Sequence, residues 1–197
     1  MEIKSNLYFN FENGEFSDTD KQNLIISKKK FKDLKSVFLK PEDESIDDEK
    51  IMYEVTGYIN EGKAGELNFG VTKIFPGEVN GEFNMTKGHY HEKMSHTEYY
   101  WGIKGRGLLI LKNIDGECSV ITVEKNSLHY IPENTAHRLV NISDEPLVVG
   151  ACWPSDAGHN YGEIQEKGFP VRIFRSNDGY SISKITDNQT DNWLGGI

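Results

Sequence analysis

The sequence predicts an all-β protein, built as a sandwich or a barrel. Between Met52 and about Tyr180, short alternating or apolar segments follow one another, separated by turn-forming pairs such as Asn80-Gly81 and Asp115-Gly116. Many short strands at close, regular spacing are typical of these architectures. The expected strands are Met52–Tyr58, Glu66–Phe75, Phe83–Thr86, Glu98–Ile103, Leu108–Lys112, Cys118–Val123, Ser127–Ile131, His137–Asn141 and Pro146–Trp153, followed by a closing hairpin of Val171–Arg175 and Tyr180–Lys184 across Asn177-Asp178-Gly179.

The remaining segments are expected to flank a single domain. We predict an extension of residues 1–50 packed on the barrel, a barrel of residues 51–186, and a loose polar tail of residues 187–197. Within the irregular extension, Leu24–Lys29 reads as a short strand. Lys30–Leu39 has apolar residues at helical spacing, which predicts a short helix.

Composition excludes several classes of function. The formal net charge of −9 disfavours binding to nucleic acid through counterion release. No apolar stretch approaches the roughly 18 residues that span a membrane, and the first residues lead into no continuous apolar run, so neither a membrane span nor a signal peptide is expected. Two cysteines, Cys118 and Cys152, without a CxxC pattern suit a reducing cytoplasm.

A cluster of histidines carries the strongest chemical signal. His89 and His91 are two residues apart, which puts both imidazoles on one face of a strand. A short turn over Lys93–Ser95 can fold the carboxylate of Glu98 back beside them, and His137 supplies a third imidazole at the start of a later strand. Three histidines and one carboxylate that leave open positions suit iron(II), manganese, nickel or zinc. If His89 and His91 stood alone, two ordinary surface histidines on a strand would be a better interpretation than a metal site.

These residues lie in two recognisable motifs. The pattern His-x-His-(x)₆-Glu-(x)₆-Gly, ending at Gly105, resembles the first cupin motif, and the stretch from Asn126 to Asn141 resembles the second. Asn126 and Asn134 stand where that motif has glycine. Asparagine is the non-glycine residue most tolerant of the left-handed conformation, so the turns are still expected. The resemblance implies a cupin double-stranded β-helix, or jelly-roll, barrel.

A narrower resemblance covers roughly residues 51 to 175. The strings Thr86-Lys87-Gly88-His89-Tyr90-His91 and Asp156-Ala157-Gly158-His159-Asn160-Tyr161-Gly162 look like those of the cupin-type glucose-6-phosphate isomerases. In that family the metal is held by the positions matching His89, His91, Glu98 and His137. Phosphate-binding positions match Tyr53, Thr72, Thr86, Lys87, Gly88 and Trp153, and positions lining the sugar match Tyr100, His159 and Tyr161.

One of these positions departs from the family pattern. Trp153 stands where the family often has a tyrosine near the phosphate. The change removes a hydroxyl but keeps an indole N–H, which puts the phosphate contact there in doubt.

The resemblance implies an enzyme that interconverts glucose 6-phosphate and fructose 6-phosphate, as in glycolysis and gluconeogenesis. One divalent ion per subunit is implied, with Fe(II) first and Mn, Ni or Zn as alternatives, together with a cytoplasmic homodimer. Glu98 is the candidate base, and Tyr100, His159 and Tyr161 are the other candidate catalytic groups. Two alternatives stay open: an iron-dependent cupin oxygenase with the same ligands, and a non-catalytic sugar-binding cupin.

Several other residues have two interpretations. His96 lies two residues before Glu98 and is an alternative ligand, whereas His129 reads as an ordinary strand residue. Lys87, Arg106 and Arg138 either add positive potential for a phosphate or lie at the surface. Sequence alone also does not choose between proton transfer through an enediol and a hydride shift.

Overall fold

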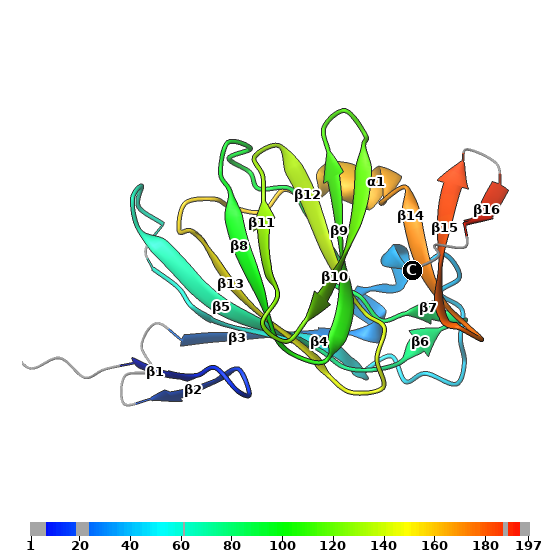
Figure 1. Cartoon of the computed structure of the whole chain (residues 1–197), viewed down its shortest axis with the longest axis horizontal. Helices are drawn as coiled ribbons and strands as arrows, with labels where there is room; N and C mark the ends of the chain where they lie inside the picture. Colours follow the sequence, from blue (N-terminus) through cyan, green and yellow to red (C-terminus); the bar gives the residue numbers. More distant parts are fainter. Residues whose placement is uncertain (1–6, 19–23, 61, 187–188, 194–197) are drawn as a thin grey trace, which may run out of the picture.

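The computed structural model describes residues 7–18, 24–60, 62–186 and 189–193, and it confirms the predicted all-β barrel (Figure 1). One wall is a six-stranded antiparallel sheet, and a three-stranded sheet stands against it. In sheet order, the first contains β11 (Leu128–Ile131), β8 (Glu98–Lys104), β13 (Leu147–Pro154), β5 (Leu67–Ile74), β4 (Ile51–Tyr58) and β3 (Leu24–Lys30); the second contains β10 (Cys118–Glu124), β9 (Arg106–Asn113) and β12 (Thr135–Asn141).

A third sheet lies beside the barrel, where β14 and β15 form the predicted hairpin. Its order is β16 (Gln189–Trp193), β15 (Gly179–Thr186), β14 (Val171–Ser176), β7 (Glu82–Phe83) and β6 (Glu78–Val79). The strand β16 differs from the loose tail that the sequence predicts, because Gln189–Trp193 pairs along β15. Residues 187–188 and 194–197 of that tail lie outside the described residues.

The extension before the barrel is more ordered than its composition predicts. The strands β1 (Leu7–Asn10) and β2 (Glu15–Asp18) form a hairpin, and β3 joins the six-stranded sheet through β4. Phe9 and Phe16 from the hairpin pack on Val71, Ile103 and Val148, so the hairpin covers part of the outer face of that sheet.

The predicted helix over Lys30–Leu39 is instead two 3₁₀ turns, η2 (Phe31–Asp33) and η3 (Lys35–Val37). The N–H of Leu34 donates to Phe31, and the N–H of Val37 donates to Leu34, which are the i to i+3 bonds of a 3₁₀ helix. The apolar spacing nevertheless identified the buried residues, since Phe31 and Leu34 are at most 1% exposed.

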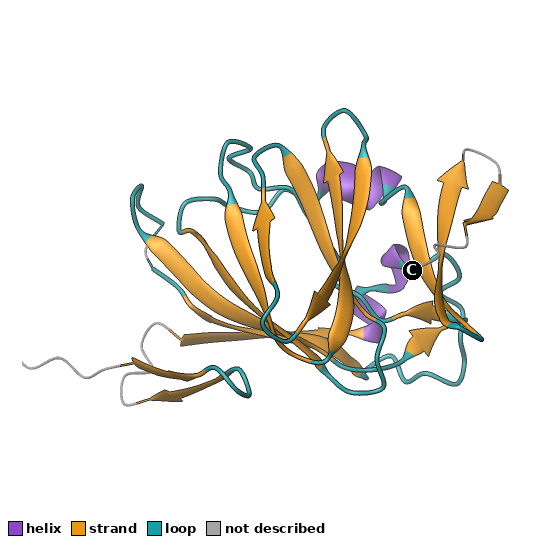
Figure 2. Ribbon diagram, viewed as in Figure 1, coloured by secondary structure: helices purple, strands orange, loops and turns teal. Residues whose placement is uncertain are grey.

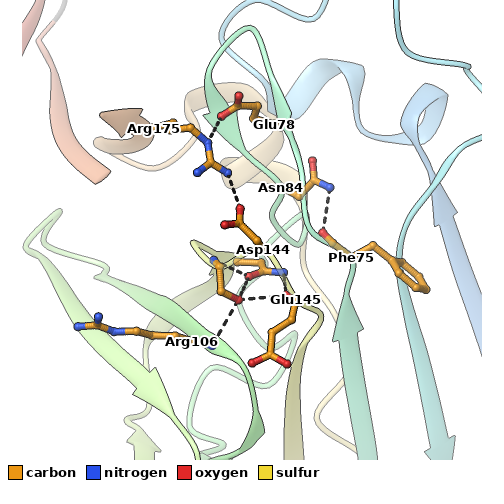
Figure 3. Close-up of polar contacts among 9 residues, drawn as sticks. Phe75, Glu78, Asn84, Arg106, Asp144, Glu145 and Arg175 are labelled. Atoms are coloured by element: carbon orange, nitrogen blue, oxygen red, sulfur yellow. Dashed lines mark hydrogen bonds and ion pairs between the residues drawn. The ribbon is translucent and has the colours of Figure 1, made fainter. Parts of the chain in front are cut away.

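The expected strand over Phe83–Thr86 is divided between two partners: Phe83, in β7, pairs with β6, whereas Met85 bridges to Val140 of β12, and Asn84 lies at the changeover. Its backbone N–H donates to Gly77 and its side-chain amide donates to the Phe75 carbonyl at 3.0 Å. Nearby, Arg175 of β14 bonds Glu78 of β6 at 2.9 Å and Asp144 at 3.2 Å (Figure 3). These polar contacts tie the third sheet to the barrel.

The sequence did not predict α1 (Gly162–Lys167), the α-helix of the described residues (Figure 2). At six residues it is too short for a clear hydrophobic period. It begins at Gly162, the last residue of the string from Asp156 to Gly162, and buries Ile164. In the described part of the chain, no helix has the length and apolar character needed to span a membrane.

Candidate active site

One cavity of about 240 Å³ enters the barrel and collects almost all of the residues that the sequence singles out. Its walls come from the inner faces of the six-stranded sheet, from β12 and from the loop before α1. Of the predicted site residues, its lining includes Tyr53, Thr72, Thr86, Lys87, Gly88, His89, Glu98, Tyr100, His137, Trp153, His159 and Tyr161. His91 is absent from this lining and lies behind it, against Glu98.

Backbone pairing brings the three histidines together. His89 and His137 form a two-way antiparallel bridge, with N–H to carbonyl distances of 3.3 and 3.1 Å. Directly opposed residues of an antiparallel pair have their side chains on the same face, so the two rings lie side by side, 4.4 Å between centroids. One ring nitrogen from each of His89, His91 and His137 falls within a group spanning at most 4.8 Å. The sequence predicts a strand for the segment that contains His89 and His91. The segment is instead held by isolated β-bridges, from His89 to His137 and from Tyr90 to Asn160.

Glu98 begins β8 directly beside this group, as the short turn predicts. Its Oε2 lies 3.3 Å from Nε2 of His91 and 3.2 Å from Nε2 of His137, and the side chain is 5% exposed. Burial on its own would raise the pKa of Glu98, but the two neighbouring imidazoles more than offset that effect and hold the pKa below its usual value. The carboxylate is therefore anionic and available to a cation.

The donor set fits a metal ion by its chemistry. Both ring nitrogens of His137 are buried and make no hydrogen bond within the described residues; Nδ1 has no polar contact there, and Nε2 has only the 3.2 Å contact with the Glu98 carboxylate. Buried polar atoms without a partner are rare unless a ligand satisfies them. Burial, followed by repulsion from His137, His159 and His91, holds the pKa of His89 well below its usual value, so that its imidazole is the neutral form that a metal requires.

The second nitrogen of His91 fixes its orientation. Nδ1 lies 3.0 Å from the His96 carbonyl, which is the arrangement expected when Nδ1–H donates and Nε2 is left for a metal. The side chain of His96 itself points elsewhere, with Nε2 2.9 Å from Asp156. His96 is thus outside the histidine group, and its backbone serves that group instead.

Asp156 is a positioning residue that sequence reasoning did not single out. Its carboxylate bonds Lys93 at 2.6 Å and His96 at 2.9 Å, which fastens the loop before α1 to the segment that contains the histidines. The His159 ring then lies 4.4 Å from the His89 ring, and Tyr161 stacks on His159 with an interplanar angle of 7°. The sequence offers one sign of a role for Asp156, which is that it begins the family-like string from Asp156 to Gly162.

The cavity lining also includes residues that offer hydrogen-bond donors rather than carboxylates. The hydroxyl oxygen of Thr86 accepts a bond from the Leu139 N–H at 3.1 Å, so its own hydrogen is free to point into the cavity. Burial raises the pKa of Tyr53 to about 12, which keeps the phenol protonated as a donor. Gly88 has a φ of 72°, and a Cβ there would lie 2.7 Å from the Phe169 ring.

Trp153 and Lys87 also line the cavity. Trp153 lies across Gly70, where a Cβ would come within 2.9 Å of the indole, so glycine makes room for the ring. The Lys87 ammonium sits 4.6 Å from the Tyr161 ring centroid and lines the cavity. Arg106 is exposed, whereas Arg138 is buried at 3% exposure and bonds the Lys87 carbonyl. Lys87 and Arg138 therefore contribute positive potential near the site, and Arg106 is a surface residue.

Comparison with known proteins agrees with the geometry. A family model described as glucose-6-phosphate isomerase matches residues 28–190. Relatives named glucose-6-phosphate isomerase include one from Thermococcus onnurineus, 40% identical over 81% of this chain and 84% of the relative, and one from Pyrococcus furiosus, 41% identical over 72% and 73%.

Solved structures of oxalate decarboxylase from Bacillus subtilis align with 53% of this chain and 26% of theirs at 21% identity, with a TM-score of 0.44, which is too low to bear on fold or function. The family model matches most of the chain, and the Thermococcus relative is 40% identical over 81% of the chain. Together these two matches establish which family the chain belongs to. The chain belongs to the glucose-6-phosphate isomerase family.

Proposed function

We infer that this chain interconverts glucose 6-phosphate and fructose 6-phosphate. The observation that carries the inference is a single cavity lined by two chemically different sets of side chains. One set is His89, His137 and Glu98, with His91 directly behind them, and the other is the hydroxyl residues Tyr53, Thr72 and Thr86. Relatives that align with most of the chain are named for this reaction. An aldose–ketose isomerase must treat the reacting carbons and the phosphate differently, which is what such a cavity provides.

His89, His91, Glu98 and His137 would hold the divalent ion. When bound, such an ion supplies Lewis-acid stabilisation of the negative charge that develops on the sugar oxygens. We propose Fe(II), with Mn, Ni or Zn as alternatives, because a set of three imidazoles and one carboxylate accepts each of these ions. Metal analysis of the purified protein would identify the ion.

The protein's own groups would move the protons. Glu98 is buried, anionic and placed among the histidines, so it is the candidate base for the proton on carbon 2. Burial raises the pKa of Tyr100 well above its usual value, so this phenol stays protonated and can donate to a sugar oxygen. His159, at the mouth of the cavity, and Tyr161 are placed to pass protons between oxygens or to assist ring opening.

The substrate's phosphate would be held mainly by neutral hydrogen-bond donors of the protein rather than by a cationic side chain at every contact. The free hydrogen of Thr86, the Tyr53 phenol and the Gly88 N–H satisfy phosphate oxygens by hydrogen bonding. Lys87 adds one cation at the cavity wall. We also propose a contact from the Trp153 indole, together with a homodimeric assembly and a cytoplasmic location.

A coupled assay tests this function directly. Fructose 6-phosphate is supplied, and glucose 6-phosphate is detected by its dehydrogenase, with the protein either metal-loaded or treated with a chelator and dialysed. We expect turnover by the loaded protein and its loss, restorable by a divalent ion, after chelation. Oxygen uptake measured in the same samples would indicate the oxygenase alternative. Binding of the sugar phosphate without turnover would indicate the non-catalytic one.

Thr86→Val is expected to weaken substrate binding rather than chemistry. Losing one hydrogen bond to a charged phosphate should raise KM for fructose 6-phosphate by about 10- to 100-fold, with kcat little changed. Thr86→Ser is the matched control, because it keeps the hydroxyl that accepts from Leu139. Unphosphorylated fructose should be handled equally by all three proteins, and an equal loss with both sugars would place Thr86 at another part of the substrate.

A further inference from the structure

A second cavity lies on the other side of Lys87 from the substrate cavity. It has a volume of about 130 Å³, and its walls come from the end of α1, from β12 and β14, and from η3. Lys87 lines both cavities, so the two adjoin at this residue. The cationic side chains in its lining are Lys87, Arg138, Lys167 and Arg172, and the lining includes one carboxylate residue, Glu166.

Arg138 is buried, Arg172 is largely buried with its side chain 11% exposed, and both are incompletely hydrogen-bonded. Arg138 is 3% exposed; it donates to the Lys87 carbonyl at 2.8 Å and stacks on Phe169 at 4.5 Å. Arg172 donates at 2.8 Å to Glu82 and at 2.7 Å to the Val37 carbonyl. The Nε–H of each guanidinium is nevertheless buried without a hydrogen-bond partner in the part of the chain that the structure describes.

The local charge balance is opposite to that of the whole chain. Burial, with repulsion from Arg172, lowers the pKa of Arg138 to about 9, so this guanidinium remains charged at neutral pH. Glu82 is already occupied by Arg172 and by the Leu39 N–H at 2.8 Å. Uncompensated buried charge is costly, and the protein as a whole carries a net charge of −9. A cationic pocket in such a chain requires a local explanation.

We propose that this second cavity binds a small tetrahedral oxyanion, with inorganic phosphate as its ligand. Phosphate accepts hydrogen bonds on every side and would neutralise part of the excess positive charge of the residues that line the cavity. The cavity is about half the volume of the substrate cavity, which suits a free ion better than a sugar phosphate. Lys87 belongs to the lining of both cavities, so the proposed phosphate site and the substrate cavity are neighbours.

Binding of radiolabelled inorganic phosphate to the full-length, metal-loaded protein tests the site. Equilibrium dialysis is run without substrate and with saturating fructose 6-phosphate, which fills the substrate cavity. We expect about one phosphate per chain to remain bound with the sugar phosphate present. Lys167→Glu, at an exposed position of the rim, should weaken this binding by more than about tenfold, because it reverses one charge of the lining.

Lys125→Glu is the matched control, since Lys125 is exposed and lies in a turn outside both cavities. It should leave phosphate binding within about twofold of the unmodified protein. Displacement of the label by glycerol phosphate as well as by unlabelled phosphate would support the same oxyanion site with an ester as its ligand. No phosphate retained beside the sugar phosphate, or equal binding by Lys167→Glu and Lys125→Glu, would overturn the proposal. Absence of turnover in the coupled assay would remove the proposed isomerase function, while the comparison of Lys167→Glu with Lys125→Glu would still decide the second site.

Discussion

His137→Ala is expected to remove both the metal and the isomerase activity. The imidazole is 2% exposed, its two ring nitrogens make no hydrogen bond within the described residues, and its Nε2 lies 3.2 Å from the Glu98 carboxylate. Changing a residue that only supports a metal ligand typically costs 10- to 100-fold in metal affinity or activity, so losing a ligand should cost at least about 100-fold. Metal content by elemental analysis and turnover of fructose 6-phosphate are measured on the same sample.

His129→Ala controls for the general effect of deleting a buried histidine. His129 is 7% exposed, and its ring bonds Ser127 at 2.8 Å, outside the histidine group. It should lose some stability but keep its metal and its kcat. His89→Ala should behave as His137→Ala does. Full metal occupancy and normal turnover in either His89→Ala or His137→Ala would show that the ligand assignment is wrong.

Short-range pattern was enough to predict much of this site. His89, His91 and Glu98 lie close together in the sequence and are joined by one short turn. Local backbone geometry is therefore enough to bring their side chains together. Asn126 and Asn134 likewise have φ angles of 71° and 57°, which confirms the left-handed turns expected where the motif has glycine. Strand positions were also predictable, because alternation reports which face is buried.

What the sequence could not predict depends on distant partners. Asp156 acts through Lys93 and His96, about 60 residues away, and a single chain gives no sign of such a pairing. Arg138 and Arg172 come from strands in different sheets, and either one alone reads as a surface cation. The turns η2 and η3 were predicted as a helix because apolar spacing reports burial and not the hydrogen-bond pattern.

Glu98→Gln tests whether this residue does more than bind the metal. The amide keeps a carbonyl oxygen that can reach a cation, but it cannot accept a proton from carbon. We expect the variant to keep at least part of its metal and to lose about two orders of magnitude or more in kcat, the usual size of a general-base contribution. Metal content, measured alongside kcat, separates this loss from simple failure to bind the ion.

Deuterated water supplies an independent measurement for the same residue. If Glu98 takes the proton from one carbon and returns it to the next, it can exchange that proton with solvent in between, and deuterium should appear at carbon 2 of the glucose 6-phosphate product. A hydride shift between the carbons carries the original hydrogen across and leaves no such label. A metal-replete Glu98→Gln protein with near-normal kcat, together with an unlabelled product, would therefore exclude Glu98 as the base. Its burial between His91 and His137 would then serve only to hold the ion.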